Sequence, residues 1–286
     1  MRVAYLGPEG TNSEEAALKY YHRRARLLPY PNIYDVIMAV QKGKVDQGFC
    51  PIENSIEGAV TEVLDLLTQY TSLKIRDEFL YPITNNLISK KNIPLSRITD
   101  VISHPQAIAQ CSKFIKKNIP KAFIHFSSST AEAVRQAPLL AGQAEFDSED
   151  HVKERIYTAI GSKTAAKIYR LKVIKKNIND HKDNMTRFVV LSKKDHPRTG
   201  DDKTSIVFSI HKDKPGGLYN VLHELAIRSI NMTKIESRPS KLSYGDYYFF
   251  IDMQGHRDDK VIQESLCMIK KKASYFTILG SYPRNH

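Results

Sequence analysis

The chain has 286 residues, of which 41% are hydrophobic and 26% charged, and a net charge of +12 at pH 7. This length suits two domains, because domains cluster near roughly 100 to 150 residues. The composition excludes a disordered chain, and no apolar run approaches the roughly 18 residues of a membrane-spanning helix. Cys50, Cys111 and Cys267 are far apart and odd in number, which argues against disulfides and a cysteine-based metal site and favours reduced core residues.

The positive charge gathers where helical patterns end. The lysine runs at residues 116–117 and 270–272 close two such segments, where cations interact favourably with the helix dipole. They lack the interleaved aromatic residues that stack on nucleic-acid bases. We therefore expect solvated helix ends, with neither a nucleic-acid nor a membrane partner. The N-terminal apolar run is too short for a signal peptide, so a cytoplasmic location is expected.

Up to Leu191, short apolar runs alternate with longer amphipathic segments, which is typical of helices that cover a mainly parallel sheet. The predicted strands there are residues 2–6, 47–50, 100–103, 122–125, 157–160 and 187–191. A polar stretch with Pro197 and Gly200 predicts a linker at residues 193–203. Beyond it the pattern predicts the order βαββαβ of a ferredoxin-like domain. Its elements are residues 204–211, 217–229, 231–238, 244–253, 258–271 and 276–281.

Four predicted strand-to-helix corners carry small polar side chains. They are residues 7–13, 51–55, 103–106 and 127–130, and in the first of them Thr11 and Glu14 have the spacing of a capping box. Helix N-termini present unpaired N–H groups and the positive end of the dipole. Where such corners converge in an open α/β sheet, a small anion is the expected ligand. Ordinary helix capping explains any one corner taken alone.

Several strings of residues resemble the prephenate dehydratase family, and they follow the family's order. In the first part these are Gly7, Pro8, Gly10 and Thr11, then residues 51–55 with Glu57 and Gly58, then 103–106 and 129–133, and finally Asn184, Thr186, Arg187 and Phe188. The second part is similar to the family's ACT domain at residues 214–218, at Asn231 and at residues 236–239. Because the chain begins directly with a predicted strand, the resemblance is to the monofunctional form.

The resemblance implies an α/β fold with two lobes around a cleft, as in type II periplasmic binding proteins, at residues 1–192. Lobe 1 would comprise about residues 1–76 and 178–192, and lobe 2 about residues 77–177, with crossings near 76–81 and 173–179. The ferredoxin-like ACT domain would occupy residues 204–286. The implied activity is a lyase reaction of L-phenylalanine biosynthesis, in which prephenate gives phenylpyruvate, water and carbon dioxide. No cofactor or metal is implied.

Feedback by L-phenylalanine in a homodimer or homotetramer is also implied. The alternatives left open are an arogenate dehydratase, which carries out the same chemistry on a substrate with an amino group, and a catalytically silent amino-acid sensor. Asn12 and Gly217 depart from the family, which more often has an aromatic residue and alanine there. Residues 135–155 form a longer, acidic stretch than is usual in the family, for which we expect a surface insertion.

The resemblance assigns catalysis to Thr186, whose hydroxyl would donate a hydrogen bond to the departing ring hydroxyl. Arg187 could hold the carboxylate that stays or be structural, since a tight grip on the departing one would oppose its loss as carbon dioxide. The expected substrate contacts are Thr11, Asn54, Ser55, Gln106, Ser129, Thr130, Arg187 and Phe188. Supporting or acid roles are open for Glu53, His104 and Asn184. The expected effector contacts are Gly216, Gly217, Leu218, Asn231, Glu236, Ser237, Arg238 and Pro239.

Overall fold

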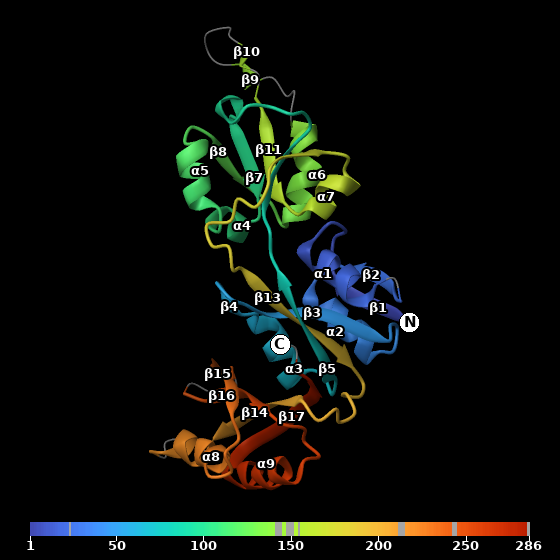
Figure 1. Ribbon diagram of the computed structural model, residues 1–286, viewed down its shortest axis with the longest axis vertical. Helices are drawn as coiled ribbons and strands as arrows, with labels where there is room; N and C mark the ends of the chain where they lie inside the picture. Colours follow the sequence, from blue (N-terminus) through green and yellow to red (C-terminus); the bar gives the residue numbers. More distant parts are fainter. Residues whose placement is uncertain are drawn as a thin grey trace.

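The computed structural model describes residues 1–22, 24–140, 145–146, 152–153, 155–210, 215–241 and 245–284. Its described part is elongated, with two α/β lobes and a C-terminal domain arranged one after the other along the long axis (Figure 1). None of the described helices has the length and apolar character that a bilayer crossing requires.

Lobe 1 is built on a sheet with the strand order β2-β1-β3-β13-β5, and β4 pairs with β3 at its side. The strands are β1 (Arg2–Leu6), β2 (Arg26–Tyr30), β3 (Gln47–Asn54), β4 (Gly58–Ala59), β5 (Lys74–Pro82) and β13 (Met185–Ser192). Its helices are α1 (Asn12–Tyr21), α2 (Ile33–Gln41) and α3 (Thr61–Gln69). Strand β13 returns from the other lobe and lies antiparallel between β3 and β5. Its first residues therefore lie where the two lobes meet.

Lobe 2 has the strand order β12-β6-β11-β7-β8. These strands are β6 (Asn86–Ser89), β7 (Asp100–Ser103), β8 (Phe123–Phe126), β11 (Tyr157–Gly161) and β12 (Lys172–Lys175). Its helices are η1 (Leu95–Arg97), α4 (Pro105–Ala109), α5 (Ser112–Asn118), α6 (Thr130–Leu140) and α7 (Lys163–Ile168), and β9 (Glu145–Phe146) pairs with β10 (Val152–Lys153). The two-lobed architecture is confirmed. Residues 141–144, 147–151 and 154 of the acidic stretch at 135–155 lie outside the described residues, so the expected surface insertion stays a prediction.

The first crossing between the lobes comes later than expected. Strand β5 stays in the lobe 1 sheet as far as Pro82, which pairs with Met185 of β13. The chain therefore crosses at residues 83–85, and it returns between β12 and β13 at residues 176–184. The sequence pattern around residues 76–81 could not show this, because the strand is extended by a partner about a hundred residues away.

The corner expected at residues 51–55 is wrong as a helix start. Strand β3 continues to Asn54, and α3 begins only at Thr61. Pro51 fits inside the strand because it lies opposite Phe188, next to a shift of register on β13. A proline has no N–H to donate, and irregular strand pairing tolerates this. The corner is thus a strand end beside the start of β13.

The C-terminal domain confirms the predicted βαββαβ order. It consists of β14 (Asp202–Ile210), α8 (Gly217–Ala226), β15 (Met232–Pro239), β16 (Tyr247–Gln254), α9 (Lys260–Lys272) and β17 (Ala273–Pro283). The antiparallel sheet has the order β15-β16-β14-β17, and in Figure 1 both helices lie on the side away from lobe 1. Cys50 and Cys111 are buried as expected, but Cys267 on α9 is exposed, which corrects its assignment to the core.

Strand β17 packs closely against β5 of lobe 1. A Cβ atom added at Gly280 would lie 2.1 Å from the carbonyl oxygen of Ile75 and 2.8 Å from its nitrogen. Both of these are backbone atoms, which cannot rotate away as a flexible side chain could. This contact between the two domains therefore requires a residue without a side chain at position 280.

We expect the substitution Gly280→Ala to lower the free energy of unfolding by about 1 to 3 kcal/mol, the usual cost of forcing extra atoms into a packed interface. Equilibrium unfolding in urea, with circular dichroism as the readout, measures this loss. An unchanged midpoint and slope would show that β17 and β5 do not approach each other in solution as they do here.

Candidate functional site

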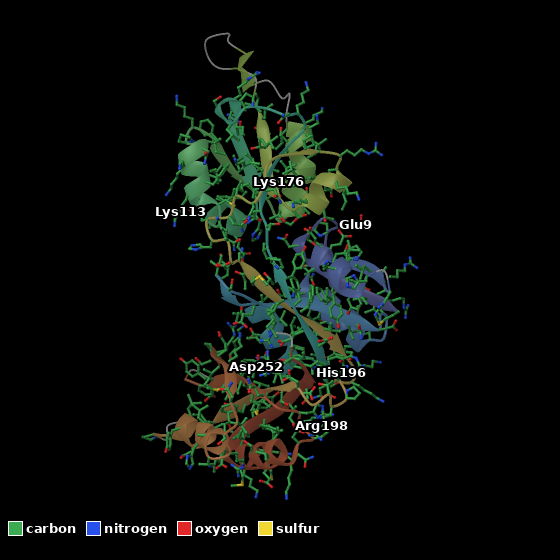
Figure 2. The ribbon with its side chains drawn as sticks, in the orientation of Figure 1. Glu9, Lys113, Lys176, His196, Arg198 and Asp252 are labelled. Carbon is green, nitrogen blue, oxygen red and sulfur yellow. The ribbon has the colours of Figure 1, made fainter. Side chains whose placement is uncertain are left out.

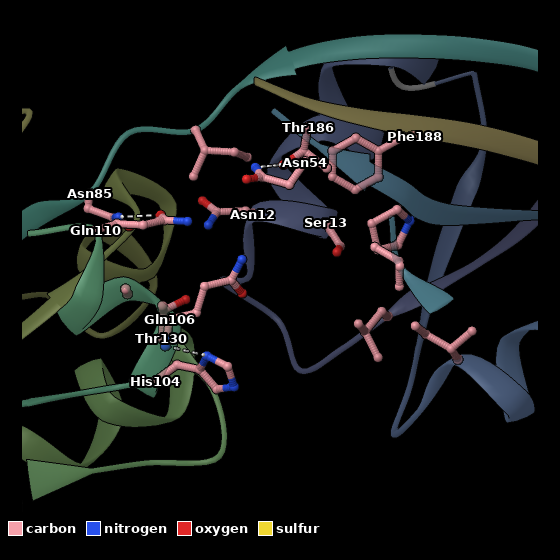
Figure 3. Close-up of a pocket in the computed structure, with 16 residues that line it drawn as sticks. Asn12, Ser13, Asn54, Asn85, His104, Gln106, Gln110, Thr130, Thr186 and Phe188 are labelled. Carbon is pink, nitrogen blue, oxygen red and sulfur yellow. Dashed lines mark hydrogen bonds between the residues drawn. The ribbon is translucent and has the colours of Figure 1, made fainter. Parts of the chain in front are cut away.

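A cavity of about 290 Å³ lies in the cleft between the lobes (Figure 3). Its size is near the lower end of small-molecule sites, which span roughly 300 to 1,000 Å³. The lining comes from both lobes, mainly from the end of β3 and the starts of β13, α1, α4 and α6. The lining residues are Leu6, Asn12, Ser13, Ile33, Pro51, Asn54, Val60, Ile83, Asn85, His104, Gln106, Ala107, Gln110, Thr130, Thr186 and Phe188.

The hydroxyl of Thr186 has a defined direction. The Asn54 side-chain oxygen accepts hydrogen bonds from the backbone N–H groups of Ile56 and Glu57, at 3.0 and 3.1 Å. This fixes the amide so that Nδ2 faces Oγ1 of Thr186 at 2.9 Å (Figure 3). Because that nitrogen can only donate, Thr186 is the acceptor. The hydroxyl proton of Thr186 is therefore free to be donated to a different acceptor. Thr186 itself lines the cavity.

A chain of neutral amides continues from this pair across the cleft. Asn184 accepts from Asn54 at 2.8 Å and donates to Oε1 of Gln110 in lobe 2 at 2.9 Å. Asn85 also donates to that oxygen, at 3.4 Å. Sequence reasoning proposed Asn184 but missed Asn85 and Gln110. The spacing of four residues between Gln106 and Gln110 was an available signal, because such residues share one face of a helix.

Three of the expected substrate contacts instead hold the backbone of the corners. Thr11 caps α1, donating to the carbonyl of Leu6 at 3.1 Å and accepting from Glu14 at 3.3 Å. Ser129 accepts from the N–H of Glu132 at 3.0 Å. Ser55 accepts from the N–H of Met185 at 2.9 Å. None of the three is among the cavity-lining residues, because Thr11 and Ser129 turn back to their own helices and Ser55 turns to the chain at the start of β13. Their neighbours Asn12, Ser13, Asn54 and Thr130 line the cavity instead.

His104 both caps a helix and lines the cavity. Its Nδ1 accepts from the N–H of Gln106 at 3.3 Å, at the start of α4, where Pro105 occupies the first helical position. That hydrogen bond assigns the ring proton to Nε2. Of the described residues that line the cavity, His104 is the one with an imidazole, a group that can act as a general acid or base. The described lining holds no carboxylate, lysine or arginine, so charged groups of a ligand would meet neutral donors.

The described residues include no group of three or more His, Cys, Asp or Glu side chains that could hold a metal ion.

Residues 3–196 match the family model for prephenate dehydratase, and residues 204–267 match that of the ACT domain. The chain belongs to the prephenate dehydratase family. Its reaction is that of the family, in which prephenate loses carbon dioxide and water to form phenylpyruvate on the route to phenylalanine.

Individual relatives agree over nearly the whole chain. A prephenate dehydratase of Methanocaldococcus jannaschii is 40% identical over 98% of this chain and 97% of its own length. The crystal structure of a prephenate dehydratase in complex with L-Phe from Arthrobacter aurescens superposes with a TM-score of 0.85 at 32% identity, covering 99% and 90% of the two chains. GqqA, described as a novel type of quorum quenching acylase, gives 0.84 at 25% identity over 100% and 98%.

Arg187 and Glu53 lie on the opposite side of the lobe 1 sheet from the prephenate dehydratase cavity. Successive side chains of a strand point to opposite faces, so Thr186 and Arg187 cannot both line it. The guanidinium of Arg187 contacts Glu78 at 2.7 Å and Asp252 of the ACT domain at 2.6 Å. Glu53 contacts Lys234 of the ACT domain at 2.8 Å. Of the two roles left open for Arg187, this geometry favours the structural one, and it places Glu53 among ionic contacts to the ACT domain instead of beside the cavity donors.

Phe188 belongs to the core of lobe 1 and also reaches the cavity. It is 1% exposed and stacks on Phe49, with ring centroids 4.9 Å apart and planes 10° from parallel. Phe188, expected as a substrate contact, therefore lines the cavity while it contributes to the packing of lobe 1.

The expected effector residues of the ACT domain form two groups within one chain. Gly216, with a φ of 80°, caps α8 just beyond the end of β14, and the pairing of β14, β16 and β15 brings this end beside residues 236–239. Asn231 lies at the other end of β15, on the order of 25 Å away at roughly 3.3 Å per residue. The side chain of Arg238 points to lobe 1, where it contacts Asp65 at 3.1 Å.

Proposed function

We propose that the cavity between the lobes binds prephenate and that Thr186 donates a hydrogen bond to the ring hydroxyl as it leaves. The hydrogen bond from Asn54 to Thr186 carries this proposal, because it turns the lone pair of Thr186 to Asn54 and leaves its proton for the cavity. One hydrogen-bond donor directed at a developing negative charge is worth about 10²- to 10³-fold. A threonine hydroxyl is a weak acid, so its contribution is a directed hydrogen bond that strengthens as the C–O bond breaks.

The neutral lining suits the loss of carbon dioxide. The electrons of the breaking bond between ring and carboxylate flow into the ring, and the C–O bond to the ring hydroxyl breaks. The departing oxygen takes up a proton from solvent and leaves as water. The departing carboxylate loses its charge on the way to the transition state. A fixed cation beside it would stabilise the ground state more than the transition state and slow the reaction. The described lining offers amides and hydroxyls in place of cations.

The carboxylate that stays is served by neutral donors at two helix starts. Asn12 and Ser13 lie in the first turn of α1, and Thr130 begins α6. Helix N-termini favour anions through their free N–H groups and the helix dipole. Gln106 lies on the same wall of the cavity as His104, whose Nε2–H is a further donor (Figure 3).

Prephenate fits this lining better than arogenate. Arogenate carries an ammonium group, and burying a cation without a paired anion is costly. The described cavity residues include no carboxylate for it. The acylase described among the structural neighbours would call for a base beside its nucleophile, whereas the partner of the Thr186 hydroxyl is an amide donor.

Regulation by L-phenylalanine is proposed to need two copies of the chain. Strand β15 is at the edge of its sheet, where unpaired backbone groups can pair with another chain. If two β15 edges met in antiparallel fashion, Asn231 of one copy would approach residues 216–218 and 236–239 of the other. This arrangement would unite the two groups of effector residues. A dimer in the cytoplasm is therefore part of the proposal.

The decisive experiment follows phenylpyruvate formed from prephenate, and phenylalanine formed from arogenate, with the purified full-length chain. We expect turnover of prephenate, a much lower kcat/KM for arogenate, and inhibition by added L-phenylalanine. If neither prephenate nor arogenate gave product, the silent sensor would be favoured. If arogenate were turned over more efficiently than prephenate, the argument from the neutral lining would be contradicted. Analytical ultracentrifugation measures the dimer.

A further inference from the structure

A buried ionic cluster joins the ACT domain to the strand that carries Thr186. Arg187 lies at its centre and contacts Glu78 of β5 at 2.7 Å, Asp252 of β16 at 2.6 Å and the hydroxyl of Tyr282 of β17 at 2.8 Å. Figure 2 shows Asp252 at the boundary between the ACT domain and lobe 1. We call Arg187 and its partners the Arg187 cluster. Its members are Glu53, Glu78, Arg187, Lys203, Ser205, Lys234, Asp252 and Tyr282.

The Arg187 cluster balances its charges internally. Lys203 contacts Glu78 at 2.7 Å, and Lys234 contacts Glu53 at 2.8 Å. With Arg187 and Asp252 this gives three cations and three carboxylates, which come from both domains. The hydroxyl of Ser205 donates a hydrogen bond to Asp252 at 2.5 Å and lies 2.6 Å from the hydroxyl of Tyr282.

Arg187 and the side chains that contact it are largely shielded from solvent. Glu78 is 1% exposed and Tyr282 fully buried, and 10% of the Arg187 side chain is exposed. Although burial alone would raise the pKa of Asp252, the charge of Arg187 and the hydrogen bond from Ser205 lower it. In such surroundings the guanidinium keeps its partners, because a buried charge without a partner is strongly unfavourable. Arg187 is therefore held by both the ACT domain and lobe 1.

The position of Arg187 bears directly on Thr186, its neighbour in the chain. On β13 the register against β3 shifts between Arg187 and Phe188, while Thr186 pairs with Asn54 just before the shift. Irregularities of this kind re-aim the side chains beside them. We therefore expect a change in the contacts of Arg187 to shift the backbone of β13 at Thr186.

We propose that Arg187 is a positioning residue through which the ACT domain sets the orientation of Thr186. Asp252 and Tyr282 lie on β16 and β17, the strands that would carry a movement of the ACT domain to lobe 1. The proposal rests on the role of Thr186 as hydrogen-bond donor. It extends that role by naming the contact through which an effector bound to the ACT domain reaches the active site.

The first test is the substitution Arg187→Lys, which keeps the charge but cannot contact Glu78, Asp252 and Tyr282 together. A small misplacement of catalytic groups can cost about 10²-fold, so we expect kcat to fall about 10- to 100-fold. KM should change less than about twofold, because Arg187 does not touch the substrate. A large rise in KM with an unchanged kcat would overturn the proposal and return Arg187 to the substrate carboxylate.

A double-mutant cycle separates positioning from general damage. In the Thr186→Val background, Arg187→Lys should lower kcat little further, because both substitutions remove the same hydrogen bond. Fully additive losses would contradict action through Thr186. If Thr186→Val alone kept wild-type kcat, the proposed role of Thr186 would fail. If Thr186→Val lowered kcat but Arg187→Lys kept the wild-type value, only the positioning role of Arg187 would fail.

The second test addresses the ACT side with Asp252→Asn and its matched control Asp195→Asn. Asp195 also contacts the ACT domain, through Arg257 at 3.0 Å, but it is outside the Arg187 cluster. Couplings between sites usually amount to about 5- to 150-fold, and we expect Asp252→Asn to lose most of the inhibition by L-phenylalanine while calorimetry still detects its binding. Asp195→Asn should respond as the wild type does. A full response in Asp252→Asn would overturn the coupling.

If Asp252→Asn does not fold, Tyr282→Phe provides the same test more gently. It removes one hydrogen bond to Arg187 and keeps the buried ring. The inhibition by L-phenylalanine should then weaken in the same direction. An unchanged response in folded Tyr282→Phe would count against the coupling, and a wild-type chain indifferent to L-phenylalanine would contradict both the feedback and the coupling.

Discussion

Replacing Thr186 by valine is expected to lower kcat for prephenate about 10²- to 10³-fold, the cost of removing one hydrogen-bond donor from a developing negative charge. Valine has nearly the same shape and suits a strand, so β13 should keep its place between β3 and β5. The amide of Asn54 would still have acceptors in Asn184 and the carbonyl of Met185. The loss would therefore report the missing hydroxyl. Steady-state formation of phenylpyruvate measures it.

The matched control is Thr186→Ser, which keeps the hydroxyl and its hydrogen bond from Asn54. It should retain activity within about tenfold of the wild type, since only a methyl group of about 1 kcal/mol is lost. Equal and near-normal turnover in the valine and serine variants would remove Thr186 from the mechanism.

Replacing Asn54 by aspartate is expected to lower kcat about 10²-fold, the cost of a misdirected catalytic group. An ionised carboxylate cannot donate, so Thr186 would turn its proton to residue 54 and away from the cavity. The backbone N–H groups of Ile56 and Glu57 would still find their acceptor. Protonation of the aspartate restores a donor, so the defect should shrink as the pH falls and grow as it rises. A pH profile of kcat measures this.

Asn32→Asp is a suitable control because it makes the same change at the start of α2, where the Asn32 side chain accepts from the N–H of Asp35 at 2.7 Å. Aspartate caps a helix as well as asparagine does. Its kcat should match the wild type at every pH at which the enzyme is stable. Wild-type kcat in Asn54→Asp would show that Thr186 does not depend on Asn54 for its direction.

Local features of the fold were predictable because their causes lie within a few residues. Thr11 and Ser129 cap the helices that follow them, and the alternation of apolar residues from Thr204 onward gives the βαββαβ order. Capping and periodicity act over one or two turns, which a sequence displays directly. The family strings added Thr186, which no local pattern distinguishes from an ordinary strand residue.

The sequence by itself therefore determined the family and the two kinds of domain, and it singled out Thr186 as the residue proposed for the chemistry. Only the tertiary structure decided which side chains meet it. Asn54 and Thr186 are 132 positions apart, and they touch because β13 returns to lie beside β3. The same pairing turns Arg187 to the ACT domain, where its partner Asp252 is 65 positions away. The alternation of side chains along a strand requires Thr186 and Arg187 to face opposite sides of the sheet. Which side holds the cavity depends on how lobe 1, lobe 2 and the ACT domain pack together.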